Sequence, residues 1–224
     1  MDQCEGIYKA LTDGESLLNT IFNRKEEGLV TSNAQPALVA LEWSLTRMWQ
    51  SNVVASSIVL GHSVGEIAAA GVAGAMTIET ALKLSFTRRR LVNQLPCHNG
   101  TMAAVRCSME EANTAMSSCL SKGEHNLVGV GIVNGPDSIV VSGMIDVVEK
   151  VLLELGKKSV YLQVSHVFHS PLMRGMESEY RRVICLHDIQ QPLTTPIASP
   201  VAGRAMLAGE TISNVKCSSS SVIT

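Results

Sequence analysis

The sequence of 224 residues has no paired cysteines, no long apolar run and no excess of positive charge. Its six cysteines are scattered without a C-x-x-C pair, which excludes a zinc ribbon or a disulfide framework and favours reduced thiols of an intracellular protein. No apolar run reaches the roughly 18 residues that a membrane span needs. The formal net charge of −2 argues against a surface for nucleic acid or anionic membrane. We therefore expect neither nucleic acid nor membrane as a partner.

The start of the chain also lacks a basic segment followed by an apolar one, so we see no secretory signal and expect a cytoplasmic location. Apolar residues, by contrast, are plentiful. Hydrophobic residues make up 46% of the chain and charged residues 17%, which allows a sizeable core. The length fits one domain, or one domain that carries a small inserted one.

A short turn organises the rest of the chain. Residues 57–60 (Ser-Ile-Val-Leu) predict a buried strand, and the alanine-rich stretch that follows the turn predicts a helix. Between them Ser63 stands between Gly61 and Gly65, which is the G-x-S-x-G pattern of a nucleophile elbow. We expect both glycines to permit close approach of strand and helix, and the N–H of Val64 to stabilise an oxyanion. The alternative is a structural turn that carries a surface serine.

Two helices are expected around this turn. Pro36 suits the first turn of a helix before the strand, and Thr77 is the expected N-cap of a helix after it. That second helix runs through three consecutive arginines, Arg88 to Arg90, and is expected to end before Pro96. We expect Arg89 and Arg90 to lie on a solvated helix face.

From Gly100 onwards the pattern changes to short strands and amphipathic helices. A capping box at Ser108–Glu111 opens the first of these helices. The expected strands and helices occupy, in order, residues 101–105, 109–120, 127–133, 138–142, 145–155 and 159–163. The order βαββαβ predicts a ferredoxin-like subdomain.

The domain organisation follows from these elements. We expect an α/β fold with a hydrolase-like parallel-sheet subdomain over residues 1–98 and 164–214. The ferredoxin-like subdomain would be inserted over residues 99–163. A disordered tail is expected over residues 215–224, where serines dominate.

Two histidines lie in the segment 164–173. His166 and His169 are either site residues or structural histidines, and no third metal ligand is evident near them. A Ser63–His169 pair is the minimum for covalent acyl transfer, because the histidine accepts the hydroxyl proton and later returns one to the leaving group. Arg88 adds a fork that can bind a carboxylate through two hydrogen bonds. Together they predict an acyl thioester with a free carboxylate as substrate.

This combination resembles the malonyl-CoA:acyl carrier protein transacylase family, and most closely the acyltransferase domains of polyketide synthases. The motifs that carry the resemblance are residues 61–66, 87–96, 133–136 and 164–173, and the likeness extends from about Asp2 to about Asn214. It implies malonyl transfer from CoA to the phosphopantetheine thiol of an acyl carrier protein, in polyketide or fatty acid biosynthesis. It implies no metal or redox cofactor. Expected partners are malonyl-CoA, the carrier protein and other synthase domains.

The resemblance also implies roles for single residues. Ser63 matches the nucleophile, His169 rather than His166 matches the general base, and Arg88 matches the arginine that binds the malonyl carboxylate. Arg89 stands where the family usually has glycine.

Further substrate contacts are implied for His62, Val64, Gln35, Asn134, His166 and Phe168. The alternative for Gln35 and Asn134 is hydrogen bonding within local turns and caps. Phe168 is bulky and leaves little room for an α-methyl group, which favours malonyl, although a methyl group is worth only about 1–3 kcal/mol in a pocket.

The chain departs from the family at both ends. The family's first strand with its Gly-Gln-Gly motif, and the part that orients the catalytic histidine, are absent from the sequence. We therefore expect a truncated chain with reduced stability and turnover, because one oxyanion donor is worth about 10²–10³ in rate. The first alternative function is an impaired fragment that acts at most as a binding module. The second is a serine hydrolase, which Arg88 disfavours because hydrolysis of neutral esters needs no carboxylate clamp.

Overall fold

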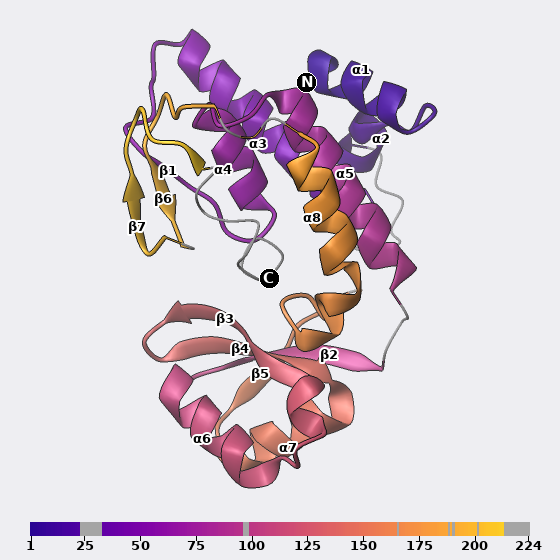
Figure 1. The fold of residues 1–224 in the computed structure, drawn as a ribbon, viewed down its shortest axis with the longest axis vertical. Coiled ribbons are helices and arrows are strands. Elements are labelled where there is room, and N and C mark those ends of the chain that lie inside the picture. Colours follow the sequence, from indigo (N-terminus) through magenta and orange to yellow (C-terminus); the bar gives the residue numbers. More distant parts are fainter. Residues whose placement is uncertain are drawn as a thin grey trace. The chain divides into compact units, whose positions relative to one another are not determined.

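The computed structural model describes residues 1–22, 33–95, 99–164, 166–187, 189, 191–200 and 202–212. These residues form two compact units (Figure 1). The first contains the described residues of Met1–Asn93 and those from Glu179 onwards, and the second is formed by Gln94–Ser178.

The first unit combines helices with a small sheet. Its elements are α1 (Asp2–Leu11), α2 (Leu17–Phe22), α3 (Ala34–Ser51), β1 (Val59–Leu60), α4 (Gly65–Val72), α5 (Ile78–Gln94), α8 (Glu177–Cys185), β6 (Ile197–Ser199) and β7 (Arg204–Met206). Pro36 lies in the first turn of α3, as expected. Thr77 caps α5, because its Oγ1 accepts a hydrogen bond of 3.2 Å from the backbone N–H of Thr80. Both predicted helix starts are confirmed.

The sheet of the first unit is mixed rather than parallel. Its strands lie in the order β1-β6-β7, with β1 parallel to β6 and β7 antiparallel to β6. The prediction of a buried strand before the elbow is wrong about burial, because Leu60 is 73% exposed and Ile58 is 50% exposed. The physical reason is that β1 pairs over two residues only and lies at the edge of the described sheet.

Helix α3 buries one side and exposes the other. Val39 and Ala40 are fully buried, and the ring of Trp43 packs beside Gly71 of α4, where an added Cβ would lie 3.5 Å from Cζ3. On the exposed side Trp49 is 55% accessible, and Leu45 is also exposed. The two tryptophans of α3 therefore lie in different environments.

The second unit has the predicted ferredoxin-like order. Its elements are β2 (Gly100–Val105), α6 (Met109–Cys119), η1 (Glu124–Asn126), β3 (Val128–Gly135), β4 (Ser138–Met144), α7 (Ile145–Leu155), β5 (Ser159–Tyr161) and η2 (Pro171–Met176). The strands form an antiparallel sheet in the order β3-β4-β2-β5. Ser108 and Glu111 form the predicted capping box at α6.

One face of this sheet carries the core of the second unit. Helices α6 and α7 lie on the same face of the sheet (Figure 1). Alternate residues of β2 and β4, such as Ala103, Ile139 and Val141, share one hydrophobic core with residues of these helices. Strand residues of the opposite face, among them Ser142, contact the segment that precedes η2. Residues 164–178 therefore group with this unit, whereas the sequence assigned them to the hydrolase-like part.

Within the described ranges, none of the helices is long and apolar enough to cross a membrane. The cysteines that the structure describes, Cys4, Cys107, Cys119 and Cys185, form no disulfide with one another. Cys97, Cys217 and the expected tail of residues 215–224 lie outside the described residues.

Candidate active site

The elbow forms as the G-x-S-x-G pattern predicts. Ser63 has a φ of 53°, a left-handed backbone conformation that is uncommon for a residue with a side chain and typical of a nucleophile elbow. The chain turns back at once, since the N–H of Gly65 donates to the carbonyl of His62 and that of Glu66 to the carbonyl of Ser63, each at 3.0 Å. An added Cβ at Gly61 would lie 2.3 Å from the carbonyl oxygen of Gly65. Strand and helix can therefore approach this closely only with glycine at position 61.

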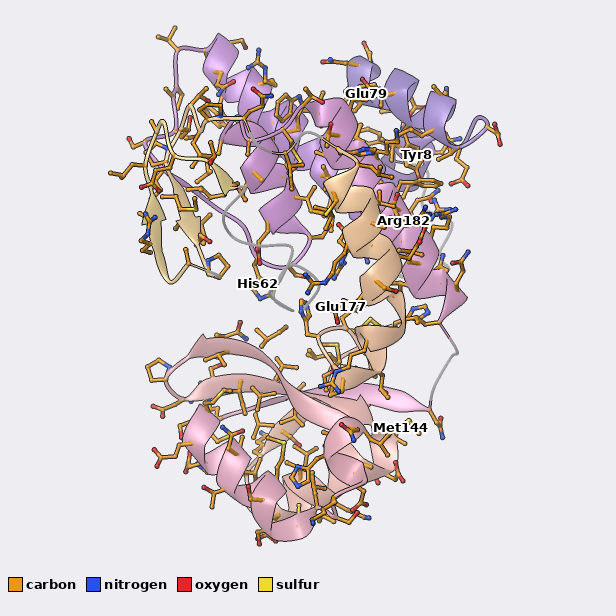
Figure 2. The ribbon with its side chains drawn as sticks, in the orientation of Figure 1. Tyr8, His62, Glu79, Met144, Glu177 and Arg182 are labelled. Carbon is orange, nitrogen blue, oxygen red and sulfur yellow. The ribbon has the colours of Figure 1, made fainter. Side chains whose placement is uncertain are left out.

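The same requirement does not apply to the second glycine. The nearest atom to an added Cβ at Gly65 is a carboxylate oxygen of Glu42 at 3.8 Å. The expectation that both glycines are needed is therefore wrong for Gly65, because the atoms nearest to an added Cβ there belong to a side chain and lie at an ordinary contact distance. Val64 is the N-cap residue of α4 and is half-buried, whereas His62 is exposed (Figure 2).

Arg88 and Gln35 come together in the first unit. Arg88 is 6% exposed on α5, and its Nη1 donates a hydrogen bond of 2.7 Å to Oε1 of Gln35, in the first turn of α3. Gln35 therefore uses its amide oxygen for the arginine. Burial lowers the pKa of Arg88, while Tyr180 of α8 and Glu66 of α4 act in the opposite direction. A buried positive charge thus lies in the same unit as the elbow serine.

The pKa of the Glu66 carboxyl is shifted by burial and by the charge of Arg88. Burial raises the pKa of the Glu66 carboxyl from the ordinary 4.5 to about 7, and the positive charge of Arg88 moderates the rise. Near neutral pH the carboxyl is therefore about half protonated. The sequence places Glu66 in the first turn of α4, but nothing local to that position predicts its raised pKa.

A pH dependence of stability follows from Glu66. Its folded-state pKa lies above the unfolded value, so the folded state holds more protons between pH 4.5 and about 7, and the free energy of unfolding falls as pH rises through that window. We expect Glu66→Gln to remove this contribution. Urea unfolding of both proteins at several pH values measures it. A difference between them that stays constant with pH would contradict the assignment.

The second unit holds His169 on the open face of its sheet. His169 has a φ of 58° and is 8% exposed. The hydroxyl of Ser142, buried in β4, donates a hydrogen bond of 2.7 Å to the carbonyl oxygen of Phe168. An added Cβ at Gly131 of β3 would lie 2.8 Å from the carbonyl oxygen of His169. The missing side chain at Gly131 and the hydroxyl of Ser142 together determine where the His169 backbone lies.

The neighbouring predicted residues take different positions. Neither ring nitrogen of His166 has a hydrogen-bond partner among the described residues, and burial lowers the pKa of this imidazole. Its ring lies 6.1 Å from that of Phe168. Asn134 is exposed near the end of β3. Over the residues that the structure describes, no group of three or more histidine, cysteine, aspartate or glutamate side chains could hold a metal ion.

Arg89 contradicts the expectation of a solvated face. Its side chain is 14% exposed and forms an ion pair with Glu15 at 2.8 Å, whereas Arg90 is exposed as expected. The sequence also gave no role to Ser142 or Gly131. One feature of the sequence could have indicated that Gly131 matters. It lies two positions after Gly129 in the same strand, and glycines inside a strand often mark the close approach of another backbone segment.

The predicted site residues thus belong to two sets. Ser63, Gln35 and Arg88 lie in the first unit, together with His62 and Val64. The second unit contains the others, namely His169, His166, Phe168 and Asn134. In the first set, Arg88 donates a hydrogen bond directly to Gln35. In the second set, Ser142 of β4 donates to the carbonyl oxygen of Phe168, and Gly131 of β3 lies close to the carbonyl oxygen of His169.

Comparison with known proteins identifies the family. Residues 1–214 match the family described as the acyl transferase domain. The chain belongs to this acyl transferase domain family. It is 42% identical over 183 residues to polyketide synthase GfsA of Streptomyces halstedii, a match that covers 80% of this chain and 2% of that protein.

Solved structures of acyl transferase domains agree in fold. The acyltransferase domain from the second module of the salinomycin polyketide synthase is 35% identical, with a TM-score of 0.81, over 96% of this chain and 49% of that one. The acyl carrier protein S-malonyltransferase from Vibrio cholerae is 25% identical, with a TM-score of 0.77, over 93% and 68% of the two chains. This acyl transferase domain chain has the α/β fold of its family and spans about half the length of the salinomycin domain.

Proposed function

We propose that this acyl transferase domain moves a malonyl group from CoA to the phosphopantetheine thiol of an acyl carrier protein, through an acyl-Ser63 intermediate. The observation that carries the proposal is the environment of Arg88. This residue is 6% exposed, and its guanidinium donates a hydrogen bond to the amide oxygen of Gln35. It lies in the same unit as Ser63, whose backbone has the left-handed conformation of an elbow. Family membership and the similarity to an acyl carrier protein S-malonyltransferase support the reaction and the carrier protein as partner.

In the first half-reaction Ser63 Oγ attacks the thioester carbonyl carbon, and His169 takes the hydroxyl proton. The N–H of Val64 donates to the oxyanion that forms. The intermediate collapses with cleavage of the C–S bond, and His169 returns the proton to the thiolate of CoA.

In the second half-reaction the phosphopantetheine thiol gives its proton to His169 and attacks the malonyl ester. The bond between the acyl carbon and Ser63 Oγ breaks, and the serine oxygen regains its proton. The two halves form a ping-pong sequence in which no metal or redox cofactor takes part.

Selection of the acyl group is assigned to side chains from both sets. Arg88 binds the free carboxylate through two parallel hydrogen bonds, with Gln35 holding the guanidinium. Phe168 limits the room for an α-methyl group, which favours malonyl by about 1–3 kcal/mol. Contacts to the rest of the acyl thioester are assigned to His62, Asn134 and His166.

The adduct itself tests the proposal. We expect intact mass spectrometry of the purified chain with malonyl-CoA to show a malonyl adduct, which Ser63→Ala abolishes. Arg88→Ala should slow its formation by about 10- to 100-fold, because a charged hydrogen bond contributes about 1.5–3 kcal/mol. Acetyl-CoA, which has no free carboxylate, is the control, and Arg88→Ala should not slow its reaction.

Other outcomes select the alternatives. A folded chain that forms no adduct would contradict the proposal and favour a binding module. Turnover of neutral esters that Arg88→Ala leaves unchanged, without transfer to a carrier protein, would favour a serine hydrolase.

A further inference from the structure

Arg89 connects α5 to two segments that precede the elbow. Its Nη1, which carries two hydrogens, lies within hydrogen-bond distance of three acceptors: the hydroxyl of Tyr8 at 2.6 Å, the carboxylate of Glu15 at 2.8 Å and Oδ1 of Asn33. The guanidinium also lies over the ring of Phe86, with Cζ 5.1 Å from the ring centroid. Tyr8 belongs to α1 and is fully buried (Figure 2). The partly buried side chain of Arg89 therefore connects α5 to the segments that contain Tyr8, Glu15 and Asn33, and is not a freely solvated charge.

Asn33 has an unusual role at the start of α3. An asparagine at this N-cap position usually accepts a hydrogen bond from the backbone of its own first turn. Within the described part of the chain its side chain makes no such cap, and Oδ1 accepts instead from Arg89 and, at 3.0 Å, from the hydroxyl of Tyr8. The backbone carbonyl of Asn33 accepts from the N–H of Ala37 at 3.1 Å, so the residue remains part of the helix start.

Two consecutive arginines thus hold the beginning of α3. Arg89 holds Asn33, and Arg88 donates to Gln35, which comes two residues later in the same turn. Asn33 and Gln35 are separated by one residue in the same turn, and the hydrogen bond from the N–H of Ala37 to the carbonyl of Asn33 closes that turn. A displacement of Asn33 therefore moves the amide that holds the Arg88 guanidinium.

We propose that Arg89 is a positioning residue, which by holding Asn33 sets Gln35 against Arg88 and so orients the guanidinium for the malonyl carboxylate. This inference rests on the proposed function.

The test separates positioning from general stabilisation. We expect Arg89→Ala and Asn33→Ala each to slow acylation of Ser63 by malonyl-CoA about tenfold, in the range of residues coupled through one hydrogen-bond network. Acylation by acetyl-CoA should change less than about twofold, because it does not use Arg88. In the background of Gln35→Ala, Arg89→Ala should cause no further loss. Arg90→Ala, the adjacent exposed arginine, is the matched control.

A second readout does not depend on activity. The side-chain Nε–H resonance of Arg88, assigned by its loss in Arg88→Lys, should shift in Arg89→Ala and keep its position in Arg90→Ala. Circular dichroism confirms that each variant is folded at the temperature of measurement.

The outcomes are distinct. The inference would be overturned if Arg89→Ala slowed acylation by malonyl-CoA and by acetyl-CoA equally. It would also be overturned if Arg89→Ala kept its full effect in the Gln35→Ala background. Either result would leave Arg89 with a structural role. If the native chain forms no Ser63 adduct, the proposed function fails and the resonance decides alone. An unchanged Arg88 signal in Arg89→Ala would then overturn the inference.

Discussion

Gly61→Ala is expected to abolish the malonyl adduct and to destabilise the first unit, whereas Gly65→Ala should leave stability nearly unchanged. At position 61 a Cβ would meet the backbone of Gly65 and Glu66 at 2.3–2.4 Å, and these atoms cannot rotate away as a side chain would. Overpacking of this kind costs about 1–3 kcal/mol and occasionally more. The elbow can relieve the clash only by opening, which removes the strained conformation of Ser63.

Urea unfolding and adduct formation measure the effect together. Gly65→Ala is the matched control, because both changes add one methyl group within the same turn, and the second meets only a carboxylate at 3.8 Å. Equal stability of the two variants would show that the strand and helix of the elbow do not need their close approach.

Gly131→Ala is expected to slow malonyl transfer by about 100-fold, since a misplacement of about 1 Å in a catalytic group can cost that much. The added Cβ would lie 2.8 Å from the carbonyl oxygen of His169 and 3.0 Å from its Cβ, so the His169 backbone must move. Its left-handed conformation leaves few alternative positions.

Gly129→Ala provides the control for this experiment. It changes the same strand on the same face, but its Cβ would meet Pro171 at an ordinary 3.5 Å. Single-turnover acylation of both variants isolates the contact with His169. If the two variants acylate at the same rate, Gly131 does not position the histidine.

Features that depend on a few neighbouring residues could be predicted from the sequence. The elbow at Ser63, the cap at Thr77 and the capping box at Ser108 need only local hydrogen bonds, and the structure confirms each. The order of strands and helices in the second unit follows from periodicity, and it leads to the ferredoxin-like sheet. These signals lie within one turn or one strand of the residues that they determine.

Features that depend on distant partners could not be predicted. Arg89 is partly covered by its contacts with Tyr8, Glu15 and Asn33, which lie 56 to 81 positions away in the chain. The support of His169 by Ser142 crosses 26 positions to reach Phe168. Helical periodicity cannot distinguish an exposed arginine from one that a distant tyrosine and carboxylate cover, because both occupy the same place in the sequence pattern.

The location of the tryptophans has a practical consequence for spectroscopy. The chain has two tryptophans, Trp43 and Trp49, and both belong to α3 in the first unit. Intrinsic tryptophan emission therefore reports the melting of that unit and is silent about the ferredoxin-like one, whereas far-ultraviolet dichroism records both. Two melting curves that fail to coincide would mean that the units unfold as separate cooperative blocks, and the position of the emission transition relative to the dichroism transitions would say which unit melts first.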